Sequence, residues 1–122
     1  FNILWLTGLM SDWKTLQKVF KKQFGSELDH EAVLFLIGIQ ELGMVKTKFK
    51  KQEKMDLMHI ALCVILEPYG FYTYTGRDAD GWPHFKSLKA LPFLVSKQQH
   101  RLVTEAIVTY FIKQGLIPDK DQ

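Results

Sequence analysis

Asp56 and His59 lie three positions apart in KQEKMDLMHIALCVIL, a segment whose apolar spacing predicts a helix. Side chains three positions apart on a helix point the same way, so this carboxylate and imidazole are expected to be neighbours. His84, beyond a predicted turn, would complete a carboxylate–histidine cluster if the chain folds back onto the helix. Such a cluster can bind a metal ion or transfer protons, whereas the simpler alternative is a hydrogen-bonded core histidine. We expect no metal or other cofactor.

Two further groups have residue types that could act as a nucleophile or bind calcium, but their neighbours do not favour either role. Cys63 follows His59 by four positions, but its apolar neighbours favour an inert packed thiol over a nucleophile. Asp78 and Asp80 match half of a calcium-binding loop, D-x-D-G, yet the acids needed at positions 76 and 87 are replaced by glycine and serine. We therefore expect a turn with two solvated carboxylates. Since the chain also has no nucleophile elbow, P-loop or dinucleotide fingerprint, no catalytic residue is assigned.

The positive charge is concentrated between residues 46 and 54. The whole chain has a net charge of +3, and the excess lies in its first half. A lysine cluster of this kind attracts nucleic acid through counterion release, or it is simply a solvated loop. The candidate nucleic-acid contacts are Lys46, Lys48, Lys50, Lys51 and Lys54.

An aromatic β-hairpin is predicted over residues 71–86, with strands at 71–75 and 82–86 joined by GRDADG. Its aromatic side chains could stack bases or anchor a protein partner. A helix followed by a hairpin is also a winged-helix arrangement, but the helix is mainly apolar and the acidic turn would repel phosphate. The candidate interaction residues are Trp5, Tyr72, Tyr74 and Trp82.

Four principal helices are expected to position these residues. Residues 1–10 are predicted to form an apolar N-terminal arm or short helix, and Ser11 to cap the first principal helix. The second helix opens at Ser26 or Asp29 and is apolar on every side, so it is central or gives a face to another chain. The remaining two are expected over about 50–66 and 96–113. Helices two, three and four should form the core, with the first lying across them.

Length and composition fit one globular domain over residues 1–122. The predicted fold class is mainly α, a compact bundle of four principal helices with one β-hairpin inserted between the third and the fourth. The single cysteine cannot form an internal disulfide, which favours the cytoplasm. No apolar run reaches the ~18–20 residues of a membrane span, and the N-terminal segment lacks a signal peptide's basic start and cleavage site.

The segment EPYGFYTYTGRDADGWPHFK resembles one shared by small uncharacterised proteins of bacterial genomes, over about residues 33–112. The resemblance implies a bacterial cytoplasm and carries no activity. The function predicted first is a non-enzymatic protein-interaction module, or a small subunit or adaptor of a larger assembly. Its expected partner is another protein or a second copy of this chain. A nucleic-acid-binding protein using the 46–54 segment is the alternative. A metal-dependent or acid–base enzyme at Asp56, His59 and His84 is the second alternative.

Overall fold

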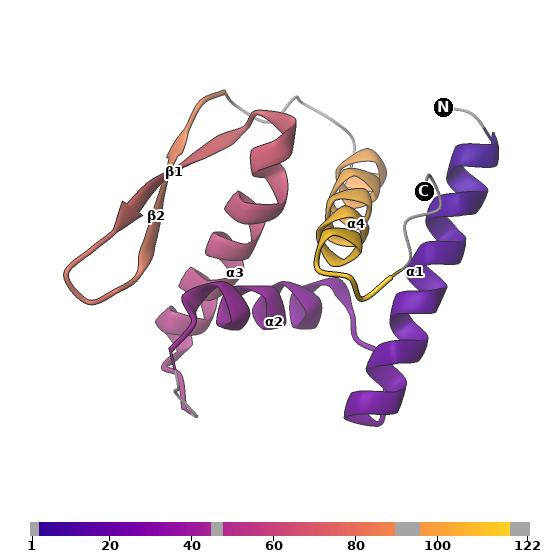
Figure 1. Ribbon diagram of the computed structural model, residues 1–122, viewed down its shortest axis with the longest axis horizontal. Helices are drawn as coiled ribbons and strands as arrows, with labels where there is room; N and C mark the ends of the chain where they lie inside the picture. The colour runs from indigo at the N-terminus through magenta and orange to yellow at the C-terminus, as the bar shows by residue number, and fades with distance from the viewer. Residues whose placement is uncertain (1–2, 45–47, 90–95, 118–122) are drawn as a thin grey trace. The chain divides into compact units, whose positions relative to one another are not determined.

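The computed structural model describes residues 3–44, 48–89 and 96–117, with side chains from residue 8 onward in the first range and from residue 98 onward in the last. The protein is mainly α, with an antiparallel hairpin between its third and fourth helices, which confirms the predicted fold class (Figure 1). The elements are α1 (Ile3–Phe24), α2 (His30–Leu42), α3 (Lys51–Leu66), the 3-10 turn η1 (Glu67–Tyr69), β1 (Tyr72–Arg77), β2 (Pro83–Ser87) and α4 (Ser96–Lys113).

Backbone contacts group the chain into two compact units. One contains residues 1–29 and 95–122, and the other contains residues 30–94. Each unit is described by itself below. The organisation of residues 1–122 as a single domain stays a prediction.

In the first unit, α1 packs against α4. Leu16 and Phe20 of α1 are buried, and the ring of Phe20 meets that of Phe111 edge-on with centroids 5.7 Å apart. The segment after α1 is fixed by Gln17, whose side-chain amide donates to the carbonyl of Leu28 (2.6 Å) and accepts from its N–H (2.8 Å). Because Gln17 is buried, this two-way hydrogen bond satisfies a polar group that would otherwise destabilise the fold.

One expectation about this unit is wrong. The first helix does not begin at Ser11 but continues without a break from Ile3, and the Ser11 carbonyl accepts the hydroxyl of Thr15 (3.0 Å) in the helix interior. Gly8 does not interrupt it, because glycine costs a helix only ~1 kcal/mol relative to alanine. The fourth helix belongs to the same unit as the first. The core of helices two, three and four stays a prediction.

In the second unit, α2 packs against α3. The predicted start of α2 after Asp29 and the predicted span of α3 are confirmed. Leu57, Ile60 and Ala61 of α3 are buried, whereas Met55 is 53% exposed.

The hairpin follows α3 through η1, which contains Pro68 and is capped by Gly70 with a φ of 85°. Its strands pair antiparallel, with Tyr72 opposite Ser87 and Tyr74 opposite Phe85. A bulge lies between Tyr74 and Gly76, where the register shifts so that Gly76 is opposite His84. Because side chains alternate along each strand, Tyr72, Tyr74 and Phe85 share one face.

Candidate functional site

A pocket of about 330 Å³ lies between α3 and the hairpin, within the second unit. Figure 1 shows the hairpin alongside α3. We call this the hairpin pocket and define it by its lining residues: Asp56, His59, Ile60, Cys63, Asp78, Trp82, Pro83, His84 and Phe85. The structure thus places Asp56, His59 and His84, which the sequence suggested as a cluster, in the lining of one pocket.

Asp78 organises the hairpin side of the pocket. Its Oδ1 accepts the backbone N–H groups of Asp80 (2.9 Å) and Trp82 (3.0 Å), which fixes the turn. Its Oδ2 lies 2.8 Å from Nε2 of His84. The hydrogen bond from His84, followed by that from the Trp82 N–H, lowers the pKa of Asp78 below its ordinary value of 3.8. Asp78 is therefore ionised. It is exposed, as expected for a turn carboxylate, and it is also hydrogen-bonded to its own turn and to His84.

The α3 side of the pocket carries a second carboxylate. Oδ1 of Asp56 accepts from the side-chain amide of Gln52 one turn earlier (2.9 Å), and Oδ2 has no partner among the residues described. His59, one turn further along, is exposed and meets the ring of Tyr72 edge-on with centroids 6.2 Å apart. One carboxylate oxygen of Asp56 is therefore available to a ligand.

Cys63 is not a plausible nucleophile in this pocket. Burial raises the pKa of its thiol to about 11. The His59 ring nitrogens lie 3.9 and 4.0 Å from its sulfur, so His59 is a weak contact rather than a close general base. No serine, threonine or tyrosine lines the pocket. In the described ranges, no group of three or more histidine, cysteine, aspartate or glutamate residues could hold a metal ion.

Trp82 and Phe85 line the pocket, and the rings of Tyr72 and Tyr74 contact the lining residues His59 and Phe85; we call these four the aromatic rim. Tyr74 is 49% exposed, and its ring meets Phe85 edge-on with centroids 5.6 Å apart. Tyr72 and Trp82 are half-buried. Three of the four predicted interaction residues thus lie in or beside the pocket; the side chain of the fourth, Trp5, is outside the described part of the chain.

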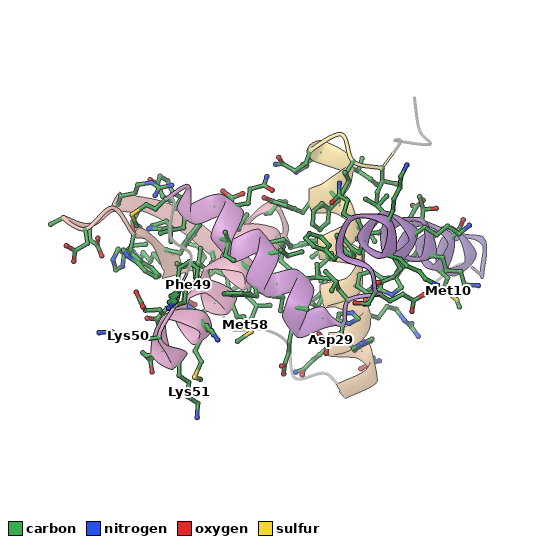
Figure 2. All side chains as sticks on the ribbon, turned by 90° about the horizontal axis from the view of Figure 1, so that it is seen from below. Met10, Asp29, Phe49, Lys50, Lys51 and Met58 are labelled. Atoms are coloured by element: carbon green, nitrogen blue, oxygen red, sulfur yellow. The ribbon has the colours of Figure 1, made fainter. Side chains whose placement is uncertain are left out.

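The lysine cluster lies elsewhere, at the start of α3 (Figure 2). Lys48, Lys50, Lys51 and Lys54 are all exposed, and Lys46 is outside the described residues. The ring of Phe49 meets that of Phe35 in α2 edge-on at 5.8 Å, which holds the segment before the helix against α2. Positive charges at a helix N-terminus oppose the helix dipole, so these lysines do not stabilise α3.

Sequence reasoning missed Arg77, which positions the hairpin. One guanidinium nitrogen donates to the carbonyls of Leu42 (2.9 Å) and Gly81 (2.6 Å), and the other to that of Glu41 (2.8 Å). Leu42 and Glu41 end α2, whose last turn contains no basic residue of its own. Arg77 therefore supplies from β1 the cation that commonly completes a helix C-terminus. The absence of a basic residue from the last turn of α2 was the only feature of the sequence that pointed to this role of Arg77.

Comparison of the chain with protein-family models, curated proteins and solved structures found no match. Across the described residues, the structure contains no helix with the length and apolar character needed to cross a membrane. The function must therefore be argued from the geometry of the site.

Proposed function

We propose that this protein is a non-enzymatic interaction module that binds another polypeptide at the hairpin pocket. The observation that supports the proposal is the pocket itself, an open hollow with aromatic walls on a fixed hairpin. The partner is a second protein or a second copy of this chain. In this role the protein would act as a small subunit or adaptor of a larger assembly.

The aromatic rim suits such a role. Tyrosine and tryptophan are enriched at protein interfaces because they bury a large apolar area and keep one polar group for hydrogen bonding. Tyr74 leaves about half of its surface exposed although it contacts Phe85, so a partner can still cover it. A side chain already fixed by a ring contact loses little conformational entropy when it binds.

Binding explains the pocket better than catalysis does. Covalent catalysis needs an activated nucleophile, and the one thiol here has a pKa of about 11. The Asp78–His84 pair could still transfer a proton, so an acid–base reaction at Asp56, His59 and His84 stays an alternative prediction. The exposed aromatic rim is not needed for that reaction, and it is explained by a polypeptide ligand.

Photo-crosslinking in the native host cell tests this proposal. A benzophenone amino acid would replace Tyr74 at the rim and, as a matched control, Lys86, which is exposed on β2 and pairs with Thr73. Because Lys86 neighbours Phe85 along the strand, it points to the opposite face. We expect a discrete adduct from position 74 and none from position 86. No adduct at 74, or the same adducts at both positions, would refute the proposal.

A second candidate function, nucleic-acid binding, is favoured by the exposure of Lys48, Lys50, Lys51 and Lys54 at one helix start. Affinity for a nucleic acid should then fall steeply with salt, and replacing these lysines with glutamine should flatten that dependence. Lys14 and Lys18, exposed on α1, provide a control pair. Equal salt dependence in the two variants would exclude the cluster as the binding site.

We further propose that the protein acts in a bacterial cytoplasm. A lone buried cysteine suits a reducing compartment, because it can form no internal disulfide. The resemblance of the EPYGFYTYTGRDADGWPHFK segment to small bacterial proteins supports the bacterial setting. Localisation of a tagged protein by fractionation of the host cell would test it.

A further inference from the structure

We propose that the hairpin pocket receives a cationic side chain, arginine or lysine, presented by the partner polypeptide. This inference rests on the proposed function and names the chemistry by which the partner is recognised. Three features carry it: the charge of the lining, its aromatic surface, and the hydrogen bonds that already engage Arg77, the residue before Asp78.

The charge of the lining is negative when its imidazoles are neutral. Two carboxylates, Asp56 and Asp78, line the pocket, and neither lysine nor arginine does. Asp56 Oδ2 has no partner among the described residues, so it can accept a hydrogen bond from a ligand. Asp78 remains ionised because its pKa is lowered, and it contributes negative charge although its oxygens are occupied. Charge-assisted hydrogen bonds of this type are stronger than those between neutral groups.

The remaining lining suits the aliphatic stem and the flat head of a long basic side chain. Ile60, Pro83 and Phe85 provide apolar surface, and Trp82 adds an indole. A guanidinium or ammonium group over an aromatic face is attracted by its quadrupole, most strongly for tryptophan. The stem of such a side chain packs on apolar surface while the head reaches the polar groups. An acidic or purely apolar side chain would leave the carboxylates uncompensated.

Arg77 does not neutralise the carboxylates of the pocket, because its guanidinium is hydrogen-bonded to backbone carbonyls. Arg77 precedes Asp78 in sequence, but its guanidinium donates to the carbonyls of Glu41, Leu42 and Gly81. His84 is the partner of Asp78, and it is charged only when protonated. The two carboxylates are therefore not matched by a permanent positive charge within the lining.

The test uses acetyl-arginine methylamide as the probe, its citrulline analogue as the uncharged isostere, and acetyl-lysine methylamide as the second cation. Amide and indole N–H signals of the isotope-labelled protein would be followed during titration. We expect saturable shifts of the Trp82 indole and the Asp56 and His59 amides with at least one cation and not with citrulline. Equal shifts with citrulline, or none with either cation, would overturn the inference.

Two variants locate the effect. Asp56→Asn should weaken binding of the cation roughly three- to tenfold, because it removes the open carboxylate oxygen. Asp80→Asn removes a charge from the hairpin turn that contains Asp78, at a position outside the lining, and should leave the affinity unchanged. Asp56 is exposed, and the amide spectrum will show that its variant is folded. Equal effects of the two substitutions would mean general charge attraction and would refute the assignment.

The two proposals fail separately. Adducts at position 74 combined with no cation binding would leave the interaction module standing and remove the cationic ligand. Cation binding at Asp56 without any adduct at position 74 would contradict the polypeptide partner and keep the pocket as a site for small cations. Either result is decisive for the proposal it concerns.

Discussion

Gly38 of α2 lies directly against the backbone of Leu57 in α3. A Cβ built on Gly38 would overlap the Leu57 carbonyl oxygen and lie 2.9 Å from the Leu57 Cβ. Backbone atoms cannot rotate away as a side chain can, so only glycine permits this approach of the two helices. Gly38 thereby sets the separation at which α3 is held, and α3 forms one wall of the hairpin pocket.

Gly38→Ala should lower the free energy of unfolding by about 1–2 kcal/mol. Overpacking costs typically 1–3 kcal/mol, which outweighs the gain of up to about 1 kcal/mol in helix propensity. Gly8→Ala is the matched control, because a Cβ there meets nothing within 4 Å. The control should gain stability in chemical denaturation. If both variants are stabilised, the close contact at Gly38 is not real.

Arg77→Ala should destabilise the second unit by about 1–3 kcal/mol, because three carbonyls lose a charged donor. Arg77→Lys should recover only part of this loss, since an ammonium group cannot reproduce the planar fork of donors. Hydrogen exchange at the end of α2 and in the hairpin would locate the effect. Lys86→Ala, at an exposed position of β2, should change neither region.

Asp78 should make the free energy of unfolding depend on pH in acidic solution. Its folded-state pKa is lowered, so the stability it contributes is present above its unfolded pKa, near 3.8, and is lost as the pH falls through the folded value. Asp78→Asn should remove this contribution to the pH dependence of the free energy of unfolding, and Asp80→Asn should leave it unchanged. In His84→Ala, a carboxyl NMR titration should show the pKa of Asp78 moving back toward 3.8, because the largest cause of its shift is gone. An unchanged titration would contradict the hydrogen bond between these residues.

Cys63 should react slowly with thiol reagents in the folded protein. Its pKa is raised from 9.0 to about 11, which lowers the thiolate population by on the order of a hundredfold near pH 8. The unfolded protein is the natural control and should react at the rate of an ordinary thiol. Similar reaction rates in the folded and unfolded states would show that the Cys63 thiol is not buried and that its pKa is not raised.

The elements of the fold were largely predictable because their limits are encoded locally. Pro68 and Gly70 mark the end of α3 and the start of the hairpin, and Asp29 directly precedes α2. The partner of each helix was not predictable, since a periodic stripe shows which side is buried but not what covers it. For this reason the sequence did not reveal that α4 packs against α1.

The candidate site was predictable only in part. The three-residue spacing of Asp56 and His59 was visible in the sequence, and His84 was placed beside them by assuming that the hairpin folds back. The role of Asp78 was obscured because D-x-D-G suggests half of a calcium loop, whereas the carboxylate bonds its own turn and His84. Arg77 was missed because its contacts with α2 span 35 and 36 residues, and no local pattern reports such a distance.

The central claim is that a partner polypeptide is recognised through the hairpin pocket. The most direct test is crosslinking from position 74 in protein that also carries Asp56→Asn, with protein that carries Asp80→Asn as the matched control. The account predicts a discrete adduct at position 74 in the wild-type and Asp80→Asn backgrounds. It also predicts that the adduct weakens when Asp56 loses its charge. An adduct of equal yield in all three backgrounds, or one that also forms from position 86, would contradict recognition of a partner through the hairpin pocket.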